Sequence, residues 1–305
     1  MEIAATVPSQ AAMPGADEAP RYSNLQLIAS SDATSTYAAH ELGTGRAVML
    51  KVVDDAAPAF AQEALDREAR YLALLSTHPS IVTMYQRTVL ADGRVALVLE
   101  ACPSSVATAI GEQRLTVPDA VSIAVKIGGA LETLHRAGLV HCAVRPQNIL
   151  LTEFDEPVLA DFGAAVGEHE ASFVAAHETT AHTAPELLLG EAPTPATDVY
   201  ALSSSLYEMV AGRAAFRSYD GESPAAISLR ILGGGVRPIV APDVPLELSD
   251  LLVWGMKPDP AERPPGAAWL VEELSRIEAK SGWLRTRVIT GEPRLPVRKR
   301  HRFFR

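Results

Sequence analysis

Two charged residues stand at positions where the surrounding pattern predicts burial. Lys51 interrupts the apolar, β-rich run of residues 47–53. Glu68 falls at the centre of the apolar stripe of a helix predicted at about residues 59–76, because a helix turns about 100° per residue. An unpaired buried charge is costly, so the simplest arrangement is that this ammonium and this carboxylate neutralise each other. The alternative is that each side chain extends separately to solvent.

Two further polar residues have the chemistry of metal ligands. Asp161 ends a predicted strand and is followed by Phe162 and Gly163, the second of which lets the chain turn. Asn148 opens the preceding strand and could reach the same ion. Carboxylate and amide oxygens suit the Mg²⁺ that accompanies bound phosphates. Taken alone, an Asp-Phe-Gly sequence is a weak signal, since ordinary turns have the same composition.

The elements that must position these residues change in type along the chain. Residues 25–100 are predicted as short strands around one helix, with a turn at Asp92-Gly93. After Pro103 helices prevail, and Thr116 and Asp119 form the capping box of a long one. A strand-rich half followed by a helix-rich half predicts an α+β protein with two segregated lobes. The expected later elements are the helices 116–135, 197–211, 225–232, 246–256 and 265–279 and the strand pair 149–151 and 158–160.

The composition limits the class of protein. The chain has 305 residues, of which 48% are hydrophobic and 21% charged, and this excludes a disordered protein. Two cysteines, Cys102 and Cys142, exclude a disulfide framework or a cysteine-based zinc site. No apolar run approaches the roughly 20 residues of a membrane-spanning helix. Residues 1–20 are acidic and rich in Pro and Ala, so we expect a disordered leader and a cytoplasmic protein.

Charge is distributed unevenly along the chain. The net charge is −10, yet residues 283–305 contain eight Lys or Arg residues and a single Glu. The acidic body argues against nucleic-acid binding. The basic tail could contact an anionic membrane or an acidic partner, and the alternative is that it is a solvated, mobile end.

In order and spacing, eight motifs resemble the eukaryotic-type Ser/Thr protein kinase family, especially its bacterial members. The resemblance covers about residues 22–280 and implies the two-lobed kinase fold. A small β-rich N-lobe at about 21–101 would carry helix C with Glu68, and a larger helical C-lobe would follow at about 102–280, then a basic tail at 281–305. The motifs are VMLK at 48–51, Glu68, HCAVRPQN at 141–148, DFG at 161–163, APE at 184–186, DVYAL at 198–202, Asp259-Pro260 and Arg263-Pro264.

The resemblance also implies roles for single residues. It implies ATP and Mg²⁺ as ligands, with Asn148 and Asp161 on the metal. It implies that Glu186 pairs with Arg263 and that Asp198 is structural. The nucleotide positions that it implies are Lys51, Glu68, Glu100 and Cys102, together with Ala29, Ser31 and Thr34 in the loop that covers the phosphates.

The catalytic loop departs from the family at its most important position. Active relatives have an Asp that accepts the proton of the substrate hydroxyl, and Ala143 stands there in this chain. A methyl group can neither accept a proton nor orient a nucleophile. General-base assistance is worth about 10²–10⁴ in rate. Neither Asp155 nor His141 is a good candidate for a substitute base.

The loop over the phosphates also departs from the family. Active members have three glycines that let the backbone approach the phosphates, and this chain has Ala29, Ser31 and Thr34. Side chains obstruct that approach, and β-branched Thr34 resists a positive φ. The alternative is that the Ser and Thr hydroxyls recover some contacts with the phosphates.

A third departure concerns regulation. Cys142 replaces the Arg that would contact a phosphorylated activation segment, so Ser172, Thr179 and Thr180 lack that partner. The thiol of Cys142 is either redox-sensitive or, as is more usual, buried and inert.

These departures predict a pseudokinase that acts as a scaffold or allosteric regulator of an unidentified protein partner, with Mg·ATP bound weakly or not at all. One alternative is a slow or unconventional Ser/Thr phosphotransferase. Another is an interaction module that does not bind nucleotide.

Overall fold

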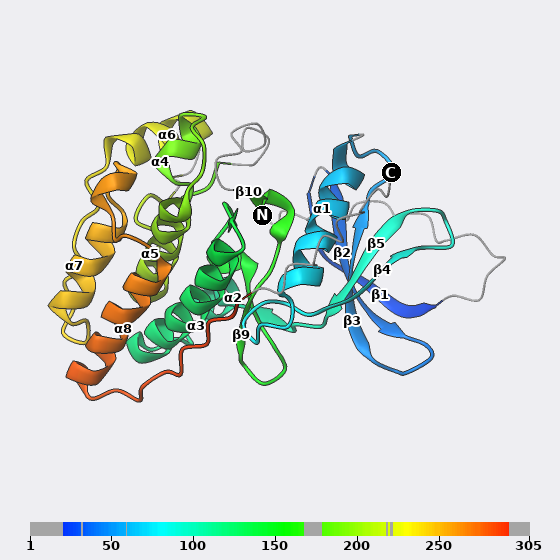
Figure 1. Ribbon diagram of the computed structural model, residues 1–305, viewed down its shortest axis with the longest axis horizontal. Helices are drawn as coiled ribbons and strands as arrows, with labels where there is room; N and C mark the ends of the chain where they lie inside the picture. Colours follow the sequence, from blue (N-terminus) through cyan, green and yellow to red (C-terminus); the bar gives the residue numbers. More distant parts are fainter. Residues whose placement is uncertain are drawn as a thin grey trace, which may run out of the picture. The chain divides into compact units, whose positions relative to one another are not determined.

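The structure is a computed structural model that describes residues 21–31, 33–58, 60–167, 179–217, 219 and 222–292. The chain divides into two compact units. The first contains Tyr85–Glu100 and the described residues up to Leu65, and the second contains Asp66–Met84 and the described residues from Ala101 onward. An antiparallel sheet in the first unit and helices in the second confirm the α+β class (Figure 1). The leader expected at residues 1–20 lies outside the described residues.

A five-stranded antiparallel sheet forms the first unit. Lys51 lies on its central strand, directly opposite Thr36 on one side and Leu97 on the other. Residues directly opposite each other point to the same face of a sheet, so these three side chains share one face. In spatial order the strands are β1 (Tyr22–Ser30), β2 (Thr34–Glu41), β3 (Ala47–Val53), β5 (Val95–Glu100) and β4 (Met84–Val89).

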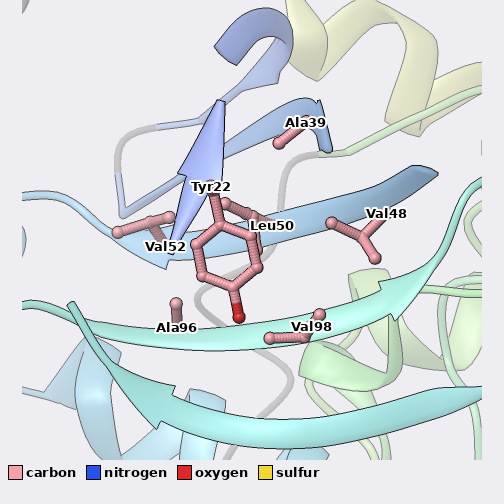
Figure 2. Packing of buried hydrophobic residues seen from close by; sticks show 7 residues of the cluster. All are labelled: Tyr22, Ala39, Val48, Leu50, Val52, Ala96 and Val98. Carbon is pink, nitrogen blue, oxygen red and sulfur yellow. The ribbon is translucent and has the colours of Figure 1, made fainter. Parts of the chain in front are cut away.

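The other face of this sheet carries the hydrophobic core of the first unit. Figure 2 shows the ring of Tyr22 lying among side chains of β3 and β5. The Tyr22 hydroxyl accepts a hydrogen bond from Gln86 Nε2 at 3.3 Å, so its buried oxygen has a partner. The cluster comprises Tyr22, Ala39, Val48, Leu50, Val52, Ala96 and Val98. Because residues 48, 50 and 52 alternate with 51, Lys51 points away from this cluster.

Helix α3 (Val117–Arg136) is the centre of the second unit. It packs against α5 (Pro195–Ala211) and α8 (Ala267–Ser281). A Cβ on Gly128 of α3 would meet a Val271 methyl of α8 at 2.4 Å, so glycine permits this close packing. The predicted capping box is present, because Thr116 and Asp119 exchange side-chain and backbone hydrogen bonds. The remaining helices are α2 (Val106–Gly111), α4 (Pro185–Leu188), α6 (Pro224–Gly233) and α7 (Leu246–Gly255).

Short strands and turns of the second unit hold the motif residues. β6 (Ser104–Ser105), β8 (Ile149–Leu151) and β9 (Pro157–Leu159) form one small sheet, and β7 (Leu139–Val140) pairs with β10 (Val166–Gly167). Single 3₁₀ turns follow at η1 (Pro146–Asn148), η2 (Phe162–Ala164) and η4 (Pro260–Glu262). The predicted helix around Glu68 is α1 (Phe60–Leu75). After α1 the chain pairs with β9 through an isolated bridge between Ile81 and Leu159.

A buried ion pair joins two segments of the second unit that are distant in sequence. Arg263, after η4, donates to both carboxylate oxygens of Glu186 on α4, at 2.8 and 2.7 Å. Thr197 donates a further hydrogen bond to this carboxylate at 2.8 Å. The guanidinium also reaches the carbonyls of Lys257, Pro258 and Ala196. The structure thus contains the pair that the resemblance implies, with its hydrogen-bonding groups satisfied.

Removing one partner of this pair should destabilise the fold strongly. We expect Arg263→Ala to lower the free energy of unfolding by about 3–5 kcal/mol, since it leaves the Glu186 carboxylate buried without a cation. Chemical denaturation measures this value. Arg276→Ala is the control, because Arg276 pairs with Glu272 while 61% of its side chain is exposed, and its effect should stay below about 1 kcal/mol. Equal effects of the two substitutions would contradict the prediction.

Candidate functional site

The catalytic-loop segment 141–148 is held by one buried carboxylate. Asp198 on α5 is fully buried and accepts hydrogen bonds from the backbone N–H of His141 at 2.8 Å and of Cys142 at 2.9 Å. His135 Nε2 on α3 lies 2.8 Å from the same carboxylate. Two backbone donors and a ring nitrogen satisfy the charge, and this explains how an acidic side chain is tolerated in the core. The loop conformation is therefore fixed from the helical core.

Cys142 occupies a strained backbone conformation in this loop. Its φ is +63°, which L-residues other than Asn and Asp rarely adopt. The hydrogen bond from its N–H to Asp198 holds it there. Burial, with the nearby carboxylates of Asp198 and Glu186, raises the pKa of the Cys142 thiol well above its usual range. The thiol therefore stays protonated at neutral pH, which supports the inert alternative over a redox-sensitive one.

Ala143 is half-buried in this loop. Its N–H donates to Nδ1 of His141 at 3.3 Å, and its carbonyl accepts from the Asn148 side-chain amide at 2.8 Å. The backbone around position 143 is thus bonded on both sides. What the position lacks is a side-chain oxygen, because alanine ends in a methyl group.

Asp161 and Asn148 have the donor chemistry of a phosphate-bound magnesium site. Asp161 is half-buried, and its φ of +63° turns the chain two residues after the end of β9. The Asn148 side-chain N–H₂ donates to the Ala143 carbonyl, so the side-chain oxygen of Asn148 could serve as a metal ligand. Within the described ranges no three His, Cys, Asp or Glu residues group as a metal site. One carboxylate and one amide oxygen fit Mg²⁺ that brings phosphate oxygens as its other ligands.

Glu68 is buried on α1 with only 1% of its surface exposed. Its Oε1 accepts a hydrogen bond from the backbone N–H of Phe162 at 3.2 Å. Phe162 is fully buried and packs edge-on against His141, with ring centres 4.8 Å apart. The carboxylate therefore bonds to the residue that follows Asp161 and is connected through Phe162 to the 141–148 loop.

The remaining nucleotide candidates belong mostly to the first unit. Lys51 is half-buried on β3, and Glu100 is half-buried at the end of β5. Cys102 is half-buried at the start of the second unit. Since Lys51 and Glu68 fall in different units, their pairing stays a prediction.

Backbone N–H groups of the β1–β2 turn form hydrogen bonds within the turn itself. The Ser31 hydroxyl accepts from the N–H groups of Ala33 at 3.3 Å and Thr34 at 3.1 Å. Ser31 N–H in turn donates to the Thr34 carbonyl at 2.9 Å. Neither Ala29, Ser31 nor Thr34 has a positive φ. The hydroxyl therefore takes up backbone donors inside the turn, and these N–H groups would have to break their bonds to reach a phosphate.

A pocket of about 470 Å³ opens beside Ala143 and Asp161 in the second unit. Thr179 and Thr180 line it, together with Arg145. Thr180 is held in a turn in which its N–H donates to the Thr183 hydroxyl at 2.9 Å. Ser172 lies outside the described residues.

His182 is a pocket residue that the sequence analysis missed. Its Nδ1 lies 2.9 Å from the Ser204 hydroxyl, and its Nε2 lies 2.9 Å from the Glu208 carboxylate. Both partners come from α5, so this contact ties the wall of the pocket to the same helix that bears Asp198. The sequence gives no local signal for it, because its partners Ser204 and Glu208 lie 22 and 26 residues further along the chain.

Comparison with known proteins supports the motif assignment. Residues 22–273 match the family described as protein kinase domain. The chain is 36% identical over 280 residues to the serine/threonine-protein kinase PknK of Mycobacterium tuberculosis, which covers 90% of this chain and 25% of that protein. It is 30% identical over 255 residues to the serine/threonine-protein kinase PknA of the same species, covering 80% of this chain and 58% of PknA. The chain thus spans about a quarter of the length of PknK. Among the described residues, no helix has the length and apolar character to cross a membrane.

The buried histidines predict how stability depends on pH. Burial lowers the pKa of His141 and of His78 below the ordinary value of 6.5. The unfolded chain therefore binds more protons than the folded chain below about pH 6.5, and stability must fall as the pH decreases through this region. For one group the slope approaches about 1.4 kcal/mol per pH unit.

Denaturation midpoints at pH 7.5, 6.5 and 5.5 measure this slope. His141→Asn should flatten it, because the Asn oxygen can still accept the Ala143 N–H but does not titrate. His40→Asn at an exposed position is the matched control. A midpoint that is constant or rises toward acid pH would show that the histidines are not held neutral.

Proposed function

Because this chain belongs to the protein kinase domain family, we propose that it is a pseudokinase that works by binding rather than by phosphoryl transfer. A single observation carries the proposal: Ala143 occupies the position of the catalytic base in a loop whose backbone is held by hydrogen bonds at His141, Cys142 and Ala143. In this role the chain would serve as a scaffold or allosteric regulator of a protein partner.

The contrast between the loop and its missing side chain supports this proposal. Had the loop lost all function, nothing would require Cys142 to keep a strained φ of +63° or Asp198 to stay buried. These features maintain the shape of the loop, whereas the lost carboxylate would have supplied chemistry. A protein that presents this surface to a partner needs the shape and not the base.

The family generally uses ATP and Mg²⁺, and the residues of this chain favour weak binding. Asn148 and Asp161 supply suitable metal oxygens. Ser31, in contrast, occupies the N–H groups of Ala33 and Thr34 inside the β1–β2 turn. We therefore propose that Mg·ATP binds with reduced affinity, held mainly through its metal.

Two alternatives remain distinguishable by experiment. The retained metal candidates favour a slow phosphotransferase, whose activity would vanish in Asp161→Ala but persist in Ala143→Ser. An interaction module that ignores nucleotide would show no response to Mg·ATP, and the basic residues of 283–305 would then contact an acidic partner or an anionic membrane. A cytoplasmic location stays a prediction.

Restoring the base tests the central part of the proposal. We expect the unmodified chain to transfer radiolabelled phosphate far more slowly than the rate of about 1–100 s⁻¹ that is typical of kinases. Ala143→Asp should raise this rate, by up to the factor of about 10²–10⁴ that a general base contributes. Ala143→Asn is the matched control of similar shape without basicity. Transfer by the unmodified chain at a normal kinase rate would refute the proposal.

A thermal-shift measurement tests nucleotide binding separately. A ligand at 100 times its Kd stabilises a protein by about 2.7 kcal/mol, so millimolar Mg·ATP should raise the melting temperature measurably. Asp161→Asn should lose the increase, because it removes the carboxylate ligand of the metal. Ser31→Gly should enlarge it, because it frees two N–H groups of the turn. No shift in any of these proteins would favour the module that ignores nucleotide.

A further inference from the structure

The segment 283–292, here called the C-terminal strap, lies along the second unit instead of leaving it. After α8 the chain runs beside α3, as the orange-red trace in Figure 1 shows. Glu278, a buried carboxylate on α8, accepts hydrogen bonds from the Thr286 N–H at 3.1 Å and the Thr286 hydroxyl at 2.5 Å. The beginning of the strap is therefore fixed by a charged group that the core has enclosed.

Helix α3 is shaped to receive the middle and the end of the strap. A Cβ on Gly129 would meet the carbonyl oxygen of Ile289 at 2.4 Å, so only glycine lets the strap approach here. One turn further along α3, the Thr133 hydroxyl accepts a hydrogen bond from the Gly291 N–H at 2.9 Å. Glycine and threonine at these two positions thus fit the backbone of the strap.

Polar backbone contacts hold the strap, and its apolar side chains are only partly covered. Leu284 is 94% exposed, and Val288 and Ile289 are 39% and 37% exposed. A segment attached by a few hydrogen bonds, with none of its apolar side chains fully buried, can detach without opening the core.

His78 connects the strap to the loop that follows α1. Its Nε2 lies 2.9 Å from the Ile289 carbonyl, and its Nδ1 accepts a hydrogen bond from the Ser80 N–H at 3.1 Å. A carbonyl only accepts, so Nε2 carries the proton and Nδ1 does not. Both ring nitrogens of His78 are thereby engaged, one with the strap and one with its own loop.

The loop around His78 joins α1, the helix that carries Glu68, to β9, the strand that precedes Asp161. The His78 N–H donates to Leu75 O at the end of α1, at 2.9 Å. On its other side, Ser80 O and the Val82 N–H bond to the backbone of Leu159, at 2.9 and 3.0 Å. Leu159 ends β9, two residues before Asp161. A continuous set of hydrogen bonds therefore runs from the strap to the end of α1, the helix that bears Glu68, and to the end of β9, two residues before Asp161.

We propose that the C-terminal strap is a regulatory clamp on the 76–82 loop. When it is docked on α3, it holds His78 and through it the end of α1 and the end of β9. When it is released, Glu68 and Asp161 lose part of their support. The proposal depends on the proposed function only in that these two residues belong to the nucleotide site.

Hydrogen exchange of the full chain tests the clamp. We expect Thr133→Val to speed exchange in residues 286–291, in 76–82 and at the Phe162 N–H that bonds Glu68, by roughly two- to tenfold. Thr133→Ser should restore the original rates, because it keeps the hydroxyl. Gly129→Ala should act like Thr133→Val, although alanine favours the helix itself.

Leu284→Ala is the matched control on the strap, since its exposed side chain makes no docking contact, and it should change no rate. Faster exchange confined to 286–291 would overturn the proposal, because the strap would then be a passive cover. A uniform rise that includes the core of α5 would overturn it as well, and so would unchanged exchange in both Thr133→Val and Gly129→Ala. Absence of any Mg·ATP thermal shift counts against nucleotide binding alone and leaves this test intact.

Discussion

The candidate site depends on a carboxylate that is enclosed in the helical core. Asp198 is fully buried on α5, and it binds the two backbone N–H groups that precede Ala143. Replacing this carboxylate by an apolar side chain would leave those donors unsatisfied in the core, at a cost of about 1–3 kcal/mol each. This anchor holds the strained backbone of Cys142 and sets the position of residue 143. It thereby places the Ala143 carbonyl within hydrogen-bond distance of the Asn148 side chain.

The 141–148 loop keeps its conformation although a methyl group stands at the position of the catalytic base. A buried carboxylate and a residue at positive φ are both costly, and they persist in folded proteins only where the surroundings maintain them. In this chain they maintain a surface beside Asp161 and the pocket lined by Thr179 and Thr180. The β1–β2 turn at Ser31 also disfavours phosphate binding, since the N–H groups of Ala33 and Thr34 already donate to the Ser31 hydroxyl. A maintained loop shape without a base supports the proposal that this chain acts by binding.

Sequence alone predicts the parts of this protein that depend on local patterns or on ordered motifs. The capping box of α3 was predictable because its two residues are three positions apart, and the Glu186–Arg263 pair followed from the motifs. The contact of Ile289 with Gly129 was not, since it joins an exposed tail to a glycine inside a helix. From the sequence, residues 281–305 are expected to form one tail, whereas α8 extends to Ser281 and the strap is anchored up to Gly291. For the turn at Ser31, the sequence leaves two alternatives: its side chains obstruct the phosphates, or its hydroxyls recover contacts with them. The hydrogen bonds of this turn depend on a loop geometry that composition does not determine.

The most direct measurement of the central claim is a single-turnover experiment on the unmodified chain at saturating Mg·ATP, with quenched samples analysed for ADP and for phosphorylated protein. If the loop is complete except for its base, both products should accumulate no faster than in the Asp161→Ala protein. A burst of either product at about 1 s⁻¹ or faster would contradict the account, because that rate lies in the range of working kinases.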